Sequence, residues 1–386
     1  MGDFGRELKQ FFRKGDMVLL VMCLAISAFS CLVLASFTNA EKFGSSTRYN
    51  IIQLGATGLG VLAYAVMTSI DLEFFSEHRV ALVIFNLGLL SLLIPFGFSA
   101  GTSNRSWLNF PFLPFNIQPA EICKITYILI TASVMNSHQS KISSVRSVFH
   151  MAFHMLLLVG ANMVISSDLG VSLIFIFIFV GMAFSGGVKL FWFLLGGGLI
   201  AAVAPILWPH MDEYQQNRIL VLFYDSIDPQ GLGVRYHYKL SLQSLTGGGM
   251  TGQGLFNGNR TQAGALPAQH TDFIFSSIGE ELGYVGCALV LVMLFALVAR
   301  CIWVGSRSPD FMRRMVCYGA ASALIFQICI NVGMCIGVAP VIGLTLPLIS
   351  YGGSSVVTIY AMLGLVSGVH ARPSPRSHER YIRPPL

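Results

Sequence analysis

The chain has 386 residues, of which 54% are hydrophobic and only 11% are charged. Soluble proteins typically carry about a quarter charged residues, so this composition excludes an ordinary soluble enzyme. Repeated uncharged runs of about 20 residues predict a polytopic helical membrane protein. The formal net charge of +6 is therefore interpreted as a signal of membrane topology, and no nucleic-acid partner is expected.

Ten apolar segments predict an all-α fold of about ten transmembrane helices. In chain order they are residues 17–37, 51–70, 80–99, 118–136, 148–166, 168–185, 188–208, 276–303, 315–338 and 342–369. The first segment is long enough to span the membrane and lacks a small-residue cleavage site, so no cleavable signal peptide is expected. The eight cysteines all lie in apolar segments, which argues against a disulfide framework or a thiolate metal site.

The distribution of positive charge predicts that both termini are cytoplasmic. This orientation leaves 16 of the 24 Lys and Arg residues inside and seven outside, with Lys124 within a span. The predicted organisation is a cytoplasmic N-terminus (1–16), transmembrane helices one to seven (17–208), a large extracellular loop (209–275), transmembrane helices eight to ten (276–370) and a cytoplasmic tail (371–386).

The predicted extracellular loop between the seventh and eighth helices is unusually long. It contains GGGMTGQGLFNGNR, a sequence at residues 247–260 that no packed strand or helix would use. Long loops in compact proteins are usually functional or disordered. This one carries too many aromatic residues for a disordered linker, so we expect it to be functional.

Earlier in the chain, the outside loop GTSNRSWLNF carries Arg105 and Trp107. Arg105 is suited to a bidentate grip on a phosphate, and Trp107 to stacking or to anchoring at the membrane interface. The alternative is an ordinary interfacial Trp with a basic neighbour that contacts lipid headgroups.

The segment IQPAEICKITYILI places Glu121 and Lys124 three residues apart, on one face of a predicted helix. A charged pair inside a span indicates a functional site by default, and Pro119 places this pair near the outside mouth. The alternative is a structural ion pair. Farther along, SSDLG places Asp168 where it can either cap a helix or serve the site.

The stretch QHTDFIFSSIGEELGYVG brings three acids to the mouth of the eighth predicted span: Asp272, Glu280 and Glu281. A partly buried carboxylate at Asp272 would have a perturbed pKa and could act as a base, whereas the alternative is a helix cap. His270 and Asp272 together give only two potential metal ligands, which is a weak signal. Glu280 and Glu281 are expected to shape the helix mouth.

The stretch APVIGLTLPLISYGGSS interrupts the last apolar region with prolines and glycines. Broken helices are tolerated in a membrane where they line a cavity, and a Gly-Gly-Ser-Ser helix start offers backbone N–H groups to an anion. The candidates for cavity lining or substrate binding here are Ser350, Gly352, Gly353 and Ser354. The alternative is close helix packing through small residues.

Together these motifs resemble the SEDS family (shape, elongation, division and sporulation), and the resemblance covers almost the whole chain. LPLISYGGSS is the most specific match, followed by LPAQHTDFIFSSIGEELGYVG. The sequence departs from the family in having QPAE for QPSE, SSDLG for QPDLG and Ala268 in place of a common acid. The second departure weakens a role for Asp168, but none affects Asp272, Glu121 or Lys124.

The resemblance implies a peptidoglycan glycosyltransferase that polymerises lipid II, with undecaprenyl-pyrophosphate-linked glycan as donor, at the outer face of the bacterial cytoplasmic membrane. It implies that Asp272 is the essential catalytic aspartate, acting as the general base, and that Glu121, Lys124, Arg105 and Trp107 belong to the substrate site, where His270 is a further candidate. It also implies a partner transpeptidase of the class B penicillin-binding type and other elongation or division proteins. A divalent cation, Mg²⁺ or Mn²⁺, is a further expectation with no ligands assigned.

Two rival interpretations remain from the sequence. A flippase for the lipid-linked precursor would equally suit broken helices and intramembrane charges. The long aromatic loop that ends at Asp272 argues against it, since a flippase has no chemical need for that loop. A scaffold that only positions other division enzymes would not need intact HTDFIF and Glu–Lys motifs.

Overall fold

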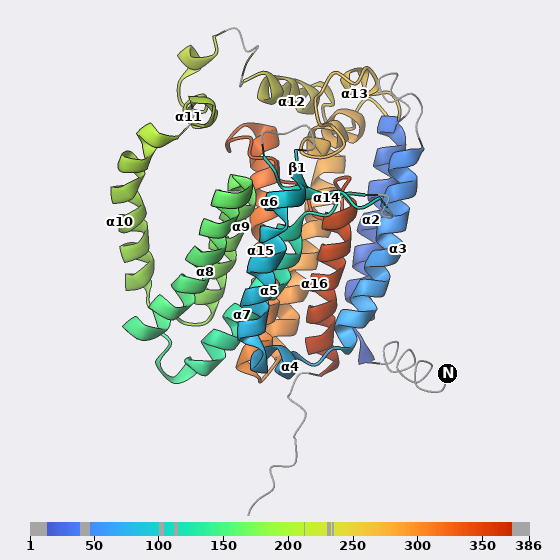
Figure 1. The fold of residues 1–386 in the computed structure, drawn as a ribbon. Coiled ribbons are helices and arrows are strands. Elements are labelled where there is room, and N and C mark those ends of the chain that lie inside the picture. Colours follow the sequence, from blue (N-terminus) through green and yellow to red (C-terminus); the bar gives the residue numbers. More distant parts are fainter. Residues whose placement is uncertain are drawn as a thin grey trace, which may run out of the picture.

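The computed structural model describes residues 14–38, 47–99, 104–111, 115–211, 213–229, 233 and 235–372. The predicted cytoplasmic N-terminus (1–16) and tail (371–386) therefore lie largely outside the described residues. The described chain is mostly helical, and its long helices run side by side as a bundle (Figure 1).

The long helices fall close to the predicted spans. They are α2 (Met17–Thr38), α3 (Arg48–Ser69), α5 (Arg79–Ser91) with the short α6 (Leu93–Phe96), α7 (Pro119–Ser137), α8 (Val145–Ser166), α9 (Leu169–Ser185), α10 (Leu190–Leu207), α14 (Ile274–Arg307), α15 (Phe311–Ile336) and α16 (Gly353–Ala371). The short α4 (Leu72–Glu77) joins α3 to α5, and strands β1 (Gly97–Phe98) and β2 (Trp107–Leu108) pair antiparallel between α6 and α7.

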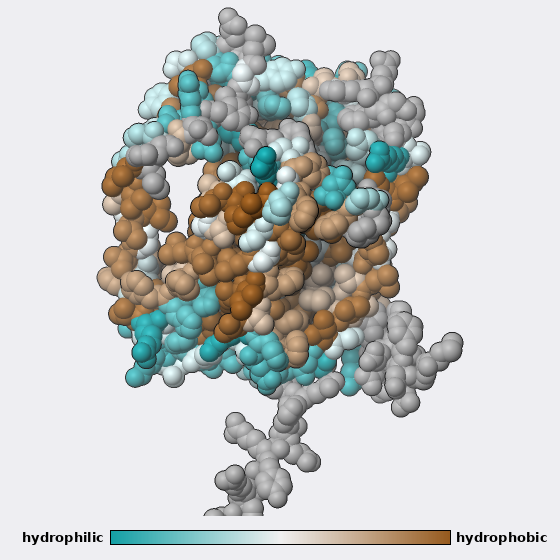
Figure 2. Space-filling view, in the orientation of Figure 1, coloured by the Kyte–Doolittle hydropathy of each residue, from teal (hydrophilic) through white to brown (hydrophobic). Residues whose placement is uncertain are grey.

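Seven of the described helices are long and apolar enough to cross a membrane: α2, α3, the stretch Arg79–Phe96, α8, α14, α15 and α16. Helices α9 and α10 are apolar but shorter. Hydrophobic residues form a broad band across the middle of the molecule, with hydrophilic residues gathered at its upper and lower ends (Figure 2). The protein is therefore a helical membrane protein, and the count of ten spans stays a prediction.

The predicted start of the last span at residue 342 is wrong. Helix α15 ends at a left-handed Gly337, and α16 begins only at Gly353. The residues between them are non-helical because Pro340 and Pro347 each lack a backbone N–H donor and restrict the preceding residue. This segment, 338–352, is called the α15–α16 connection below.

Helix α14 is broken within its first three turns, where Gly283 adopts φ 68° and ψ −168°. The glycine-rich stretch predicted to be a loop packs against this break. Gln253 N–H donates to the Glu280 carbonyl at 3.0 Å, and Tyr284 N–H donates to the Gly249 carbonyl at 3.0 Å. A Cβ at Gly252 would lie 2.1 Å from the Glu281 carbonyl oxygen, so the close approach requires glycine.

Between α10 and α14, the chain forms α11 (Glu213–Leu220), α12 (Tyr236–Gly247) and α13 (Asn259–Gln262), which lie across one end of the bundle (Figure 1). Helix α10 stands apart from the other helices at the edge of the molecule, and almost all of its described side chains are exposed. The buried core instead centres on α7, α15 and α16, in which most residues are buried.

Candidate active site

Asp272 lies two residues before α14, and its backbone is held from α15. The Asn331 side-chain amide donates to the Asp272 carbonyl at 2.8 Å and to the Leu344 carbonyl at 2.7 Å. A Cβ on Gly343 would lie 3.8 Å from Asp272 Oδ2, so the carboxylate sits beside the α15–α16 connection. One α15 side chain thus fixes both Asp272 and the segment that faces it.

The α15–α16 connection is also tied to the residues just before Asp272. Tyr351 N–H donates to the His270 carbonyl at 2.8 Å, and Ser350 Oγ donates to the Thr271 carbonyl at 2.6 Å. Ala268 and Leu348, at φ 51° and φ 61°, hold left-handed conformations that are uncommon for residues other than glycine. Such conformations persist only where surrounding contacts impose them, which points to a backbone set by tertiary structure.

The Asp272 carboxyl is held in an environment that favours its neutral form. Burial raises its pKa from the ordinary 3.8 to about 6, Asp168 raises it further, and Arg218 and the Thr271 hydroxyl oppose the rise. A carboxyl with a pKa near 6 is largely ionised at neutral pH and more basic than a free aspartate. Asp272 is therefore suited to accept a proton from a substrate.

Asp168 caps α9, and its carboxylate also bonds two other segments of the chain. Its Oδ1 accepts from Val171 N–H at 3.1 Å, which satisfies the predicted cap. Its Oδ2 accepts from the Ser106 hydroxyl at 3.2 Å and from the Gln118 amide at 3.1 Å. Burial is the main reason that the pKa of Asp168 is raised, and the nearby Glu121 carboxylate adds to it. Both interpretations of Asp168 are therefore compatible with its position, since it caps a helix and lies beside the site.

Glu121 and Lys124 form a buried ion pair on α7, at 2.8 Å between Nζ and Oε1. The other oxygen of Glu121 accepts from the Thr358 hydroxyl of α16 at 3.0 Å. The two side chains are only 5% and 3% exposed, so neither faces lipid. The pair joins α7 to α16, and the Lys124 charge is already compensated within the protein.

Glu280 and Glu281 bind the chain segment that packs on α14. Glu280 accepts from the backbone N–H groups of Arg260 and Thr261, at 3.0 and 2.9 Å. Glu281 accepts from the Ser36 hydroxyl at 2.6 Å and the Gln262 amide at 2.7 Å. Both carboxylates are buried and accept hydrogen bonds from the protein itself, which agrees with the expectation that they shape the helix mouth.

The remaining predicted residues take up different positions. Arg105 is exposed, while the half-buried Trp107 lies in β2 opposite Phe98. Gly353 begins α16, where a Cβ would lie 2.2 Å from the Phe115 ring, and the buried Ser354 hydroxyl accepts from Gln118 N–H at 3.2 Å. Through Gln118, α16 is therefore linked to Asp168 and to the loop that carries Arg105.

A cavity of about 620 Å³ lies next to this network. Its walls are mostly apolar side chains of five helices, including Leu59 of α3, Phe75 of α4, Phe85 of α5, Ile125 of α7 and Val357 of α16. Thr358, the hydrogen-bond partner of Glu121, is also part of the lining. An apolar cavity with a few polar groups at one place is the usual form of a small-molecule site.

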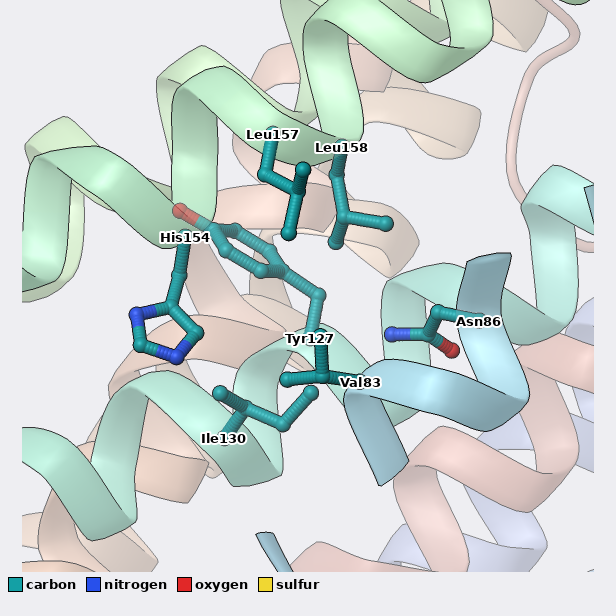
Figure 3. A pocket seen from close by; sticks show the side chains of 7 residues that line it. All are labelled: Val83, Asn86, Tyr127, Ile130, His154, Leu157 and Leu158. Atoms are coloured by element: carbon teal, nitrogen blue, oxygen red, sulfur yellow. The ribbon is translucent and has the colours of Figure 1, made fainter. Parts of the chain in front are cut away.

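A second, small pocket between α5, α7 and α8 has a volume of about 10 Å³, which is enough for about one water molecule. Figure 3 shows the residues that line it: Val83, Asn86, Tyr127, Ile130, His154, Leu157 and Leu158. The amide nitrogen of Asn86 points into it and has no hydrogen-bond partner in the described part of the chain. None of the predicted site residues lines this pocket.

Sequence reasoning missed Arg218 of α11. Its charge lies close enough to Asp272 to oppose the rise in the pKa of that carboxyl, and close enough to lower the pKa of His237 on α12. The signal available in the sequence was an arginine in the YQQNR stretch of an aromatic-rich loop. Nothing in that pattern indicated which acid it would approach.

Within the described ranges, no three His, Cys, Asp or Glu residues are arranged to hold a metal ion. Mg²⁺ often binds through one or two carboxylates together with substrate phosphates, so a divalent cation stays an expectation with no ligands assigned.

Comparison with known proteins gives one consistent result. A family model described as a cell cycle protein family, named for FtsW, RodA and SpoVE, matches residues 15–374. The peptidoglycan glycosyltransferase MrdB of Escherichia coli K12 is 32% identical over 360 residues, which cover 92% of this chain and 93% of MrdB. The probable peptidoglycan glycosyltransferase FtsW of Trichlorobacter lovleyi is 29% identical over the same shares of the two chains.

Solved structures show the same relationship. A chain of a peptidoglycan synthase complex, described as coordinating polymerization and crosslinking, has a TM-score of 0.77 and 29% identity, covering 92% of this chain and 97% of its own. The rod shape determining protein RodA of Thermus thermophilus has a TM-score of 0.67 and 27% identity, covering 92% and 96%.

Proposed function

The chain belongs to the cell cycle protein family of FtsW, RodA and SpoVE, and we propose that it is a peptidoglycan glycosyltransferase that polymerises lipid II at the outer face of the bacterial cytoplasmic membrane. We propose that both termini are cytoplasmic and that residues 209–275 face outside, on the same side of the membrane as the reaction. The proposal includes a role in cell shape, division or sporulation.

The proposed reaction transfers a glycan from undecaprenyl pyrophosphate to the acceptor sugar of the next lipid II. Asp272 removes the proton of the acceptor hydroxyl as its oxygen forms a bond to the anomeric carbon of the donor. The bond from that carbon to the pyrophosphate breaks, and undecaprenyl pyrophosphate leaves. The single observation that carries this assignment is the Asp272 carboxyl, whose pKa is raised by burial to about 6 and whose backbone is held by Asn331.

The pyrophosphate leaving group needs positive charge. The Arg218 guanidinium lies close enough to Asp272 to lower the pKa of that carboxyl, so Arg218 is the residue that we propose to supply this positive charge, with Arg105 as the second candidate that the family resemblance implies. A divalent cation bound to the phosphates would supply further charge to the leaving group.

The apolar cavity of about 620 Å³ supports a lipid-linked substrate. Its walls suit an isoprenoid chain, while Thr358 and Ser354 give the lining two hydroxyls and Thr358 bonds Glu121 behind it. A lipid tail held in this cavity would keep the attached sugar close to Asp272 and limit its orientations, which favours the reaction.

We further propose a partner transpeptidase of the class B penicillin-binding type, because the described chain holds no domain to crosslink the glycan. Co-purification from native membranes tests this partnership. Full activity of the isolated protein, recovered without any such partner, would argue against it.

The direct test is incubation of the purified protein with lipid II, with and without Mg²⁺ or Mn²⁺ and with and without the partner, followed by separation of glycan strands on a gel. Glycan formation that disappears in Asp272→Asn is the expected result. Transport of labelled lipid II across vesicle membranes by wild-type protein, without polymer under any condition, would favour the flippase interpretation instead.

A further inference from the structure

Three aromatic rings from distant parts of the chain meet beside Asp272. Tyr49 lies in the first turn of α3, His270 precedes Asp272 by two residues, and Tyr351 lies in the α15–α16 connection. The ring centroid of Tyr49 is 5.1 Å from that of His270 and 4.9 Å from that of Tyr351, with edge-to-face orientations. The centroids of His270 and Tyr351 are 5.8 Å apart. We call these three residues the aromatic platform.

The platform is held from beneath by hydrogen bonds. Gln53 lies one helical turn after Tyr49, so both side chains project from the same face of α3. Its amide donates to the Ser350 carbonyl at 3.3 Å and accepts from Gly352 N–H at 3.4 Å. These bonds fix Tyr351 under Tyr49, while the bond from Tyr351 N–H to the His270 carbonyl fixes the third ring. The arrangement of the rings is therefore set by three elements.

The three rings of the platform do not belong to the buried core. All three are half-buried, whereas Gln53 and Ser350 beneath them are buried. Burial lowers the pKa of His270, so its ring is neutral at neutral pH and adds no charge to the surface. The platform thus offers uncharged, partly accessible rings at the rim of the bundle, next to a carboxylate with a raised pKa.

We propose that the aromatic platform binds the acceptor sugar ring by stacking and presents its hydroxyl to Asp272. A hexose has an apolar C–H face and a rim of hydroxyls, so it packs on an aromatic ring while its hydroxyls reach polar groups at the edge. The lipid tail belongs elsewhere, in the apolar cavity, because the platform carries phenol and imidazole polar atoms. This inference rests on the proposed glycosyl transfer and assigns the acceptor subsite within it.

The alternative is that the three rings have only a structural role and fill space at the end of the interface between α3 and α16. Substitutions at Tyr49 distinguish sugar stacking from simple packing. Tyr49 is chosen because, of the three platform residues, it is the most distant in sequence from Asp272. Stacking requires an aromatic ring, whereas packing requires only apolar volume. Tyr49→Phe keeps the ring, and Tyr49→Leu keeps apolar volume without it.

The test measures initial polymerisation rates against lipid II concentration, with equal amounts of folded protein and a constant amount of partner. We expect Tyr49→Phe to behave as wild type, and Tyr49→Leu and Tyr49→Ala to raise the KM for lipid II by on the order of tenfold, as loss of one stacked ring does elsewhere. Phe74→Ala removes an exposed aromatic from α4, beyond the other end of α3, and should leave KM unchanged.

A second measurement needs no turnover. Saturation-transfer NMR with the lipid-free disaccharide of N-acetylglucosamine and N-acetylmuramic acid should show transfer to the sugar C–H protons in wild type and Tyr49→Phe, and loss of it in Tyr49→Leu. Unchanged KM and unchanged transfer in Tyr49→Leu would overturn the platform while leaving the proposed polymerase intact. A wild-type protein that makes no glycan with any partner or cation would instead overturn the proposed function itself.

Discussion

The Ser350 hydroxyl donates a 2.6 Å hydrogen bond to the Thr271 carbonyl and accepts one from Leu346 N–H at 2.8 Å. Both of these bonds are internal, and the side chain is 3% exposed. Ser350, predicted from the sequence to line a cavity or bind substrate, is thus placed to hold the backbone on which Asp272 is mounted. The residue positions the site by joining two segments that are far apart in the sequence.

Removing this hydroxyl should weaken the site without removing its chemistry. Ser350→Ala leaves the Thr271 carbonyl and Leu346 N–H without their partner, at a cost of about 1–3 kcal/mol. We expect a lower thermal unfolding midpoint and a lower kcat, with the pH at which activity is half-maximal unchanged because Asp272 remains. A shifted pH midpoint would show that Ser350 acts on the carboxyl itself.

Asp272→Asn keeps the volume of the side chain but removes the base. Polymerisation should fall by a factor on the order of 10² to 10⁴, the usual contribution of a positioned base. Asp272→Ala should be no more active. The comparison is polymer yield at equal folded protein. Wild-type yield from the Asn variant would mean that Asp272 is not the base, and that the catalytic carboxylate must be sought among the other acids.

The pH dependence of polymerisation should report Asp272. The carboxyl accepts a proton only when ionised, and burial raises its pKa to about 6, so kcat/KM should fall as pH drops through about 6. Because the folded-state pKa is raised, the ionised form is the less favoured one in the folded protein. Stability should therefore decline as pH rises from about 4 to about 6, and Asp272→Asn should lose this decline. A pH profile that is flat down to pH 4.5 would exclude the assigned base.

The buried pair of Glu121 and Lys124 should show strong coupling. Lys124→Met leaves the Glu121 carboxylate buried with only the Thr358 hydroxyl, which should cost about 3–5 kcal/mol. The double variant Glu121→Gln, Lys124→Met should recover most of that stability because no unpaired charge remains. Thermal unfolding in detergent measures both. Equal midpoints for the wild type and Lys124→Met would show that the pair is solvated and not structural.

The topology prediction is tested at Asn257, which is exposed in the glycine-rich segment that packs on α14. Asn257→Cys should react with a membrane-impermeant thiol reagent in intact cells, because 16 of the 24 Lys and Arg residues place the termini inside. A cysteine at Ser308, which is buried at the end of α14, gives the matched control and should stay unlabelled. Labelling of Asn257→Cys only after lysis would reverse the orientation.

The sequence by itself determined the class of protein and the approximate helices, and it predicted Asp272 as the catalytic base. Hydropathy is a local property, so runs such as Met17–Thr38 predict a span without knowledge of their neighbours. The same locality explains the failure at residue 342, where apolar composition continued although Pro340 and Pro347 prevented a helix. The Glu121–Lys124 pair was singled out because charge is rare in such segments, and Asp272 because it lies where the long loop meets a span and matches the family motif.

Only the tertiary structure decided what surrounds those residues. Asn331 holds Asp272 from another helix, Arg218 approaches it from α11, and Tyr49 reaches His270 across more than half of the chain. Such contacts depend on how helices pack, and packing joins residues whose separation in sequence carries no periodic signal. For the same reason, Glu280 and Glu281 could not be assigned to the segment they bind until the break at Gly283 brought that segment onto α14.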